Sequence, residues 1–359
     1  SISSAAYMPA MRPPLYAHGS FAFFGKYGDN RCGILDGGGA TRVLGELIIG
    51  YLFFGGMGAA MLAMLGVREI LHARHALLPA CNRGMGFLGE QASWPPYDEG
   101  AARAWAACAF CLCLGSLLLF VDLGRPERVF QFLLSSRLSV MTVGAYALGA
   151  SVVCSLAFAA EYFFDSVSFP RVPRVLLGVV SLLSGMLTAT YTGVLLQSMN
   201  SVVFWQTPLL PMLFLVSSFS CAAACIAASV SSCDMLAKPS RFVRRLLSFD
   251  MVLIAFEGAC VFLYLVLSFI SNDARLAVRE LLSGELSTVF WLGVVLLGLV
   301  TPLVLEAKGL RSPKGSSVCI CALFVLAGGI FLRFCIVSAA AYDITNTPEF
   351  IYGLSIGAV

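Results

Sequence analysis

The chain has 359 residues, of which 59% are hydrophobic and only 12% are charged, with a formal net charge of +3 and a mean hydropathy of +0.87. This composition excludes an ordinary soluble globular protein, and a small net charge without a basic stripe gives no indication of nucleic-acid binding. It predicts an all-α polytopic membrane protein, for which the lipid bilayer is a partner.

The first 42 residues are rich in proline, glycine and aromatic side chains and lack the compact apolar core of a cleavable signal peptide. We expect residues 1–42 to form an arm outside the bilayer.

Eight apolar segments follow, each long enough to cross a hydrocarbon layer of about 30 Å at about 1.5 Å per helical residue. They are predicted at 43–66, 103–121, 138–162, twice within 175–233, then at 249–270, 288–305 and 316–341.

The stretch from Val175 to Cys233 contains no charged residue, yet its first crossing carries several polar side chains: Thr188, Thr190, Tyr191, Thr192 and Gln197. A tyrosine hydroxyl inside a bilayer needs a hydrogen-bond partner, either on a neighbouring helix or on a ligand.

Cysteine and histidine give little indication of a metal centre. Most of the thirteen cysteines lie in apolar segments, where cysteine behaves as a small hydrophobic residue. Cys108 and Cys111 form a CXXC pair inside a continuous apolar helix, without the further ligands that a cluster needs. The three histidines, His18, His72 and His75, are expected in the arm or in a loop at 67–102. We therefore expect no haem, no iron–sulfur cluster and no other metal in this protein.

Eight crossings place both termini on the same side of the membrane. Lysine and arginine number nine in the segments on that side and thirteen on the other, or five against thirteen without the arm. Since basic loops stay in the cytoplasm, both termini are predicted to lie outside.

Several segments together resemble one family. They are YLFFGG at 51–56, DLGRPER at 122–128, YTGVLL at 191–196, WQTPLLP at 205–211, and Gly328, Gly329 and Arg333 in the last helix. In this order they resemble the NrfD/polysulfide-reductase-type membrane anchors, from about Gly45 to Ala340. The 67–102 loop is longer than that pattern, and the arm has no counterpart.

The resemblance implies a membrane-anchor subunit of a respiratory redox complex in a bacterial or archaeal cytoplasmic membrane. It also implies two four-helix bundles without haem, at 43–200 and 201–341, with a C-terminal tail at 342–359. The first bundle would hold a quinone, menaquinone or ubiquinone. The implied partners are an iron–sulfur electron-transfer subunit and a catalytic subunit, often a molybdopterin enzyme.

Site residues follow from the resemblance and from the chemistry of their side chains. Tyr191 is expected to donate a hydrogen bond to a quinone carbonyl, with Thr188 and Arg333 as further quinone-binding groups. Glu46, inside the first helix, is expected to exchange protons there. Two alternatives stay open: Tyr191 bonded to a neighbouring helix, and Glu46 paired with Arg42 at the interface.

The turn after the second helix is expected to dock the iron–sulfur partner through Asp122, Gly124, Arg125 and Pro126. Its alternative is a stiff turn alone. For Glu257, we favour the interpretation as a buried hydrogen-bonded carboxyl over a role in a proton path.

A transporter or ion-translocating protein is the alternative function. It is disfavoured because no helix carries a dense polar pathway and no inverted repeat is evident.

Overall fold

A computed structural model describes residues 37–75, 99–123, 140–164, 169–198, 203–231, 241–270, 274–284, 286–309 and 315–345. All regular secondary structure in these ranges is helical, and eight segments are long and apolar enough to cross a membrane. The all-α fold class and the eight crossings are therefore confirmed. The grouping into two four-helix bundles, with the boundaries given above, stays a prediction.

The first four spans are α1 (Gly37–His75), α2 (Glu99–Leu123), α4 (Val140–Phe163) and α5 (Arg171–Gln197). The last four are α6 (Leu209–Ser231), α7 (Arg241–Ile270), the π-helical η4 (Val289–Val300) with its continuation α9 (Thr301–Gly309), and α10 (Gly315–Thr345). Two short helices, η3 (Val203–Trp205) and α8 (Arg275–Ser283), lie in connections.

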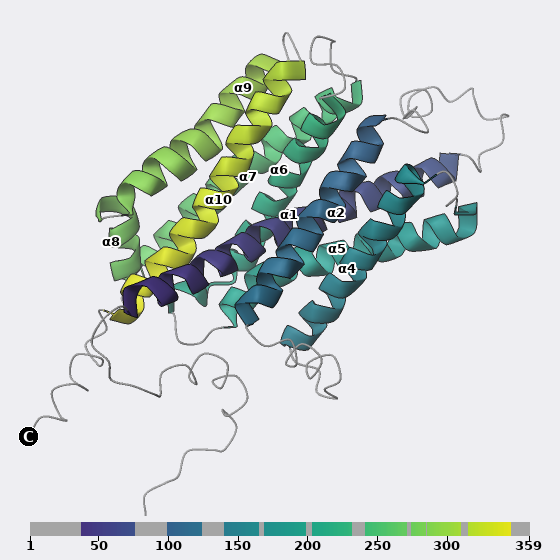
Figure 1. Cartoon of the computed structure of the whole chain (residues 1–359). Helices are drawn as coiled ribbons and strands as arrows, with labels where there is room; N and C mark the ends of the chain where they lie inside the picture. The colour runs from purple at the N-terminus through teal and green to yellow at the C-terminus, as the bar shows by residue number, and fades with distance from the viewer. Residues whose placement is uncertain are drawn as a thin grey trace, which may run out of the picture. The chain divides into compact units, whose positions relative to one another are not determined.

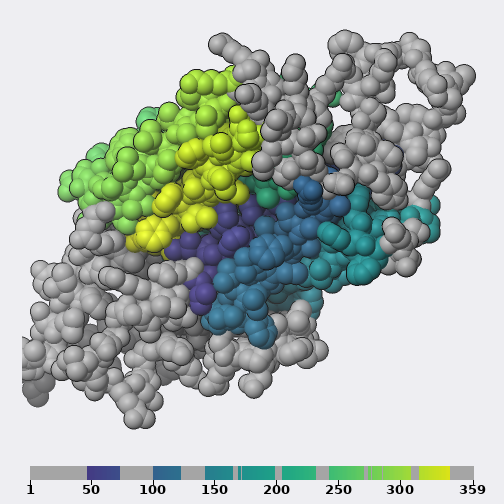
Figure 2. All heavy atoms as spheres, turned by 45° about the horizontal axis from the view of Figure 1, so that its top comes forward, coloured from purple at the N-terminus to yellow at the C-terminus, as the bar shows by residue number. Residues whose placement is uncertain are grey.

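Helix α6 connects the two sets of spans, because it contacts α2 and α5 of the first set and α7 and α10 of the last. In Figure 1, α8, α9 and α10 lie on one flank and α4 and α5 on the other. Figure 2 shows α10, α1 and α2 side by side on one face. The first four and the last four spans therefore meet along α1 and α6.

Two helices are longer than the hydropathy pattern predicts. Helix α1 continues to His75, so the placement of His72 and His75 in a loop was wrong. Helix α7 begins at Arg241, eight residues before the predicted start, and Arg244 and Arg245 are exposed on it. Hydropathy marks only the part of a helix inside the bilayer, whereas arginine continues helical winding beyond it.

The connection predicted at 271–287 contains the amphipathic helix α8. Ala277, Val278 and Leu281 are buried, while Arg275 and Arg279 are exposed. Nine residues are too few for a membrane span, so a search for long apolar segments overlooks such a helix.

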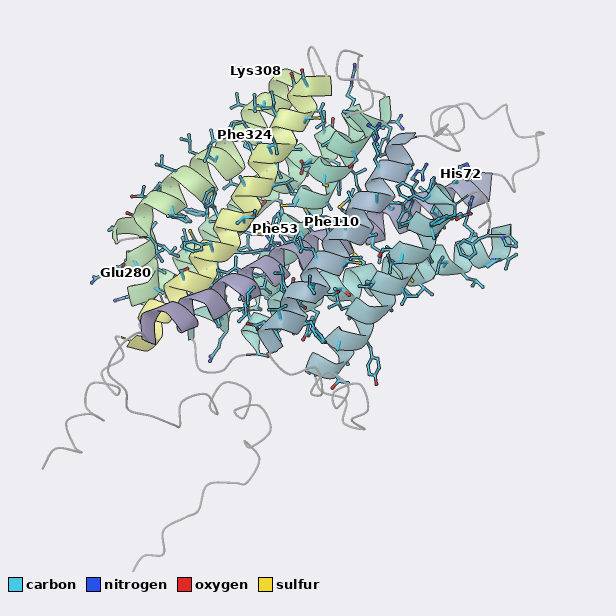
Figure 3. All side chains as sticks on the ribbon, viewed as in Figure 1. Phe53, His72, Phe110, Glu280, Lys308 and Phe324 are labelled. Carbon is cyan, nitrogen blue, oxygen red and sulfur yellow. The ribbon has the colours of Figure 1, made fainter. Side chains whose placement is uncertain are left out.

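The outward surface of the spans is strongly apolar. Phe110 is 63% exposed, Phe262 70% and Leu323 67%. Figure 3 places Phe110 part-way along α2, and Glu280 and Lys308 near the ends of their helices. Exposed aromatic and aliphatic side chains of this density are covered by lipid in a membrane protein.

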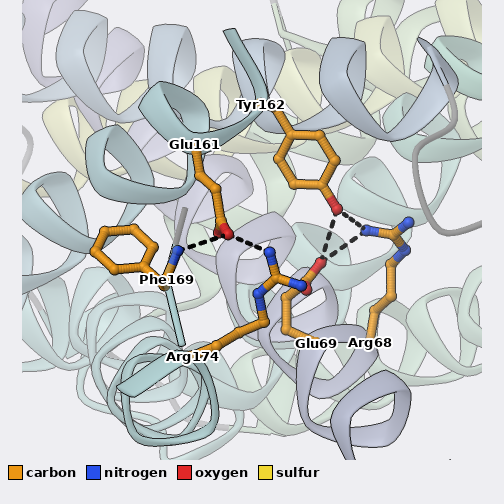
Figure 4. A network of polar contacts seen from close by, with 6 residues as sticks. All are labelled: Arg68, Glu69, Glu161, Tyr162, Phe169 and Arg174. Carbon is orange, nitrogen blue, oxygen red and sulfur yellow. Dashed lines mark hydrogen bonds and ion pairs between the residues drawn. The ribbon is translucent and has the colours of Figure 1, made fainter. Parts of the chain in front are cut away.

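Two buried ion pairs join α1, α4 and α5 (Figure 4). Arg68 Nη1 donates to Glu69 Oε1 and to the Tyr162 hydroxyl, both at 2.7 Å, and the Tyr162 hydroxyl donates to Glu69 Oε1 at 3.2 Å. Arg174 pairs with Glu161, whose Oε1 also accepts the Phe169 N–H at 3.1 Å. Each of these carboxylates has a guanidinium beside it, as buried charges require.

The turn between α5 and α6 is held against the last four spans. Trp205 Nε1 donates to the Ile336 carbonyl at 3.1 Å, and the Tyr264 hydroxyl donates to the Phe204 carbonyl at 2.6 Å. These bonds connect η3 to α10 and α7, and so set the position of the C-terminal end of α5.

Packing of α10 on η4 depends on two facing glycines. A Cβ atom at Gly328 would lie 2.2 Å from the Gly298 Cα, whereas one at Gly149 would meet nothing within 4 Å. We expect Gly328→Ala to destabilise the fold by about 1–3 kcal/mol, since backbone is the obstacle and overpacking strains it. Gly149→Ala should leave stability unchanged or slightly higher. Thermal unfolding in detergent measures both; equal melting temperatures would contradict the close approach.

Candidate functional site

Two tyrosines, one on α1 and one on α5, lie within the first four spans. Tyr51 is only 1% exposed, and its hydroxyl has no hydrogen-bond partner among the described residues. Tyr191 is half-buried on α5 and lies within electrostatic range of Tyr51. We call Tyr51 and Tyr191 the tyrosine pair. Sequence reasoning used Tyr51 only as part of a motif, although a hydroxyl inside an apolar span was the signal available.

The ring of Tyr191 packs on α4 at Gly144. A Cβ atom at Gly144 would lie 2.2 Å from the Tyr191 Cζ, so only glycine leaves room for this ring. Within the described part of the protein, no hydrogen bond is formed by the Tyr191 hydroxyl. The alternative of a bond to a neighbouring helix therefore has no support among the described residues, and quinone binding by Tyr191 stays a prediction.

Thr188 lies one turn before Tyr191 on α5. It is fully buried, and its Oγ1 shares a hydrogen bond of 3.2 Å with Ser151 Oγ on α4. Its hydroxyl therefore joins α5 to α4, and a role in binding a cofactor stays a prediction.

Arg333 is fully buried on α10 and bonded to three helices. Its Nε donates to the Leu52 carbonyl of α1 at 3.2 Å, and its Nη1 donates to the Gly329 carbonyl at 2.9 Å. On α6, Ser217 Oγ accepts from Nη1 at 3.2 Å and Ser218 Oγ accepts from Nη2 at 2.8 Å. Of the five guanidinium N–H groups, these bonds use four, so one hydrogen of Nη2 is left for another partner.

The guanidinium of Arg333 also lies between aromatic rings and near a carboxyl. The ring centres of Phe53 and Phe214 are 5.5 and 5.3 Å from its Cζ. Glu257 on α7 is buried within hydrogen-bonding range of Ser217, which also accepts from Arg333. Ser217 thus lies between the guanidinium of Arg333 and the carboxyl of Glu257, whose charge offsets that of the arginine. This agrees with the interpretation of Glu257 as a hydrogen-bonded carboxyl.

Gly56 on α1 allows polar groups of three helices to converge beside the tyrosine pair. An added Cβ atom there would lie 2.7 Å from Ser218 Oγ, 3.6 Å from Thr192 Oγ1 and 3.7 Å from Arg333 Nη2. Arg333 binds the carbonyl of Leu52, the residue next to Tyr51. Arg333, Ser218 and Thr192 are therefore parts of one polar region at the junction of α1, α5, α6 and α10, and Tyr51 precedes the α1 residue that Arg333 binds.

An open hollow of about 330 Å³ lies at the C-terminal end of α5, lined by Val194, Gln197, Ser198 and Gln206. Val194 is one turn beyond Tyr191 on the same helix. This volume is at the lower end of the usual range for small-molecule sites.

The other predicted site residues are described only in part. Glu46 lies within α1, but its side chain is outside the described residues, as are Gly124, Arg125 and Pro126. Asp122 is half-buried near the end of α2, and its Oδ1 has no hydrogen-bond partner in the described ranges. Proton exchange by Glu46 and partner docking by the turn stay predictions.

No group of three or more histidine, cysteine, aspartate or glutamate side chains that could hold a metal occurs in the ranges given above. Cys108 of the CXXC pair donates to the Gly58 carbonyl at 3.4 Å, which joins α2 to α1.

Comparison with known proteins gives consistent matches. The family model "Polysulphide reductase, NrfD" matches residues 39–344. A polysulfide reductase subunit of Wolinella succinogenes is 32% identical over 270 residues, covering 68% of this chain and 83% of that protein. Protein NrfD of Escherichia coli is 28% identical over 251 residues, covering 63% of this chain and 78% of that protein.

The Arg333 bonds generate a prediction about charge and shape. Arg333→Lys keeps the positive charge but loses the planar fork that reaches Leu52, Ser217 and Ser218 together. We expect the loss of these bonds to destabilise the protein by about 1.5–3 kcal/mol, the range for a hydrogen bond to a charged group. Thermal unfolding in detergent measures this, with Arg244→Lys, at an exposed position, as the matched control. Equal stability of the two variants would contradict the importance of the fork.

Proposed function

Because the chain belongs to the NrfD family of polysulphide reductase membrane subunits, we propose that it exchanges electrons between membrane quinone and a peripheral iron–sulfur subunit. It is the membrane subunit of a polysulfide-reductase-type complex. Family membership alone does not establish that this chain binds a quinone or that electrons pass directly between the quinone and a partner subunit.

The observation that carries the proposal is the unpaired hydroxyl of Tyr51. Tyr51 is 1% exposed and lies within electrostatic range of Tyr191, whose hydroxyl forms no hydrogen bond with another described residue. A buried donor without an acceptor costs about 1–3 kcal/mol, which a carbonyl oxygen placed between the two rings removes. Quinones carry such carbonyl oxygens on a flat apolar ring, which also suits the aromatic surroundings.

Access to this place is supported by the hollow at Val194, Gln197 and Gln206. It opens within about one helical turn of Tyr191 along α5, so a lipid-soluble molecule enters at the end of the helix without separating α1 from α5. The quinone that binds, menaquinone or ubiquinone, is the one present in the surrounding membrane.

When bound, a quinone supplies coupled uptake and release of electrons and protons. The protein contributes position and protons: Tyr51 and Tyr191 hold the carbonyl oxygen in a region closed to water. Arg333 holds the Leu52 carbonyl and so sets the part of α1 that carries Tyr51. We assign proton exchange to Glu46, five residues before Tyr51 on the same helix.

The turn that begins at Asp122 would dock the iron–sulfur subunit, with Gly124, Arg125 and Pro126 making a rigid surface. Since the protein is proposed to bind no haem, electrons would pass directly between the quinone and a cluster of that subunit. A catalytic subunit, often a molybdopterin enzyme in this family, would complete the complex. We also propose a bacterial or archaeal cytoplasmic membrane as the location, with both termini outside.

Tyr51→Phe and Tyr191→Phe test the site. Each removes one hydroxyl and keeps the ring, so the complex should assemble normally. A lost hydrogen bond of about 1–3 kcal/mol corresponds to a roughly five- to hundredfold decrease in quinone-linked turnover or quinone affinity. Turnover of the assembled complex with quinone and with a soluble artificial electron donor or acceptor should be measured side by side.

Tyr146→Phe is the matched control, because Tyr146 is 49% exposed on α4 and distant in sequence from the tyrosine pair. It should keep wild-type quinone turnover, and all three variants should react normally with the soluble donor or acceptor. Wild-type quinone turnover and affinity in both Tyr51→Phe and Tyr191→Phe would disprove the site.

Orientation has its own test. A reporter inserted between residues 232 and 240 should lie in the cytoplasm, whereas a reporter after Val359 should lie outside, because the basic side of the protein is retained. Alkaline phosphatase and green fluorescent protein fusions measure the two positions. Reversed compartments would show that the proposed orientation is wrong.

A further inference from the structure

Two carboxyl groups are buried against each other in the last four spans. Asp250 on α7 has no exposed surface, Glu306 on α9 is 2% exposed, and each lies within interaction range of the other. Asp250 Oδ2 and Glu306 Oε2 both lack a hydrogen-bond partner among the described residues. The two helices that carry them are in contact.

Each carboxyl is held at its second oxygen by a neutral donor. Ser220 Oγ on α6 donates to Asp250 Oδ1 at 2.6 Å. Cys321 Sγ on α10 lies 3.8 Å from Glu306 Oε1 and 3.7 Å from the Pro302 carbonyl, and its one hydrogen is shared between these two acceptors. Four helices therefore position the pair, with one oxygen of each carboxyl fixed and the other unpaired.

No cation compensates this pair within the described part of the protein. The groups that act on Asp250 are Glu306, Ser220 and Glu257, and those that act on Glu306 are Asp250 and Cys321. The buried thiol of Cys221 on α6 is a further neighbour of Asp250. Arg333, the buried cation of these helices, uses its N–H groups on Leu52, Ser217, Ser218 and Gly329. In contrast, Glu69 and Glu161 each have an arginine beside them.

Two ionised carboxylates at this place would repel each other in a medium of low dielectric constant, with no cation among the described residues to stabilise them. A single proton removes one charge and supplies the hydrogen bond that the two unpaired oxygens lack. We propose that Asp250 and Glu306 form a proton-binding site that holds one shared proton, separate from the tyrosine pair.

Its place in the membrane allows the proton to exchange with one face. Glu306 is two residues before Lys308, which is exposed at the end of the span (Figure 3). Asp250 is nine residues, or about 13 Å, beyond the start of α7 at Arg241, and Glu257 is about 10 Å farther along. The pair thus lies between that face and the Glu257–Ser217–Arg333 group. This inference does not depend on quinone binding.

Infrared absorption of the purified full-length protein tests the proposal. At neutral pH, the absorption band of protonated carboxyl groups should be stronger in wild type than in the double variant Asp250→Asn, Glu306→Gln. The difference should correspond to one protonated carboxyl per molecule. The band should shift in heavy water, because the proton exchanges with solvent. Glu161→Gln is the control: its carboxylate is paired with Arg174, so the protonated-carboxyl absorbance should stay at the wild-type value.

A difference of zero, which means two ionised carboxylates, or of two, which means two separate protons, would overturn the shared site. A band that does not shift in heavy water would overturn exchange with solvent. Wild type carrying isotope-labelled aspartate or glutamate gives a second measurement that needs no variant. Because the proton is shared, labelled aspartate and labelled glutamate should each shift part of the protonated-carboxyl band. A band that shifts with neither label would contradict the proposal.

Discussion

The buried guanidinium of Arg333 is the interaction on which the junction of the spans depends. A positive charge in the middle of a membrane protein is costly unless its surroundings replace water. Here four hydrogen bonds, two aromatic faces and the nearby Glu257 replace it. Because these partners belong to α1, α6, α7 and α10, satisfying one side chain places four helices relative to each other. The tyrosine pair is positioned as a consequence, since Tyr51 precedes the Leu52 carbonyl that Arg333 binds.

The length of a hydroxyl-bearing side chain decides what its burial implies. Ser151 and Thr192 are buried, yet each bonds to a carbonyl of its own helix, at Ala147 and Ala189. A hydroxyl bonded in this way needs no partner on another helix or on a ligand, so its burial requires no functional explanation. A tyrosine hydroxyl lies too far from its own backbone for this solution. The unpaired hydroxyl of Tyr51 is therefore stronger support for a ligand than the greater number of serines and threonines in α4 and α5.

Hydropathy predicted the eight spans and the all-α class because each bilayer crossing needs a long apolar segment, whatever its neighbours. The same rule hid Asp250 and Glu306. The predicted spans began at 249 and ended at 305, so Asp250 stood one residue inside one limit and Glu306 one residue beyond the other. Both therefore appeared to lie at the membrane edge, whereas the helices continue past those limits and bury them. Tyr51 was overlooked for a related reason: whether a hydroxyl is paired depends on contacts between helices distant in sequence. Tyr191 was singled out as a hydroxyl within an uncharged span, and the resemblance then assigned Tyr191 and Arg333 to the predicted quinone site.

Buried carboxyls are stabilised in two different ways in this molecule. Glu69 and Glu161 each share their charge with an arginine, so their protons have no reason to return and they act as fixed connections between α1, α4 and α5. Among the described residues, Asp250 and Glu306 have neutral donors and carboxyl groups around them, and no cation. The Asp250–Glu306 pair is stable in the protein interior when it holds one proton, and it can release that proton when the surroundings change. The fixed ion pairs lie in the first four spans and the exchangeable proton in the last four. Arg333 donates to Ser217, and Glu257 lies within hydrogen-bonding range of the same serine. A change of charge at Asp250 therefore acts electrostatically on Glu257, along α7, toward the junction that holds Tyr51.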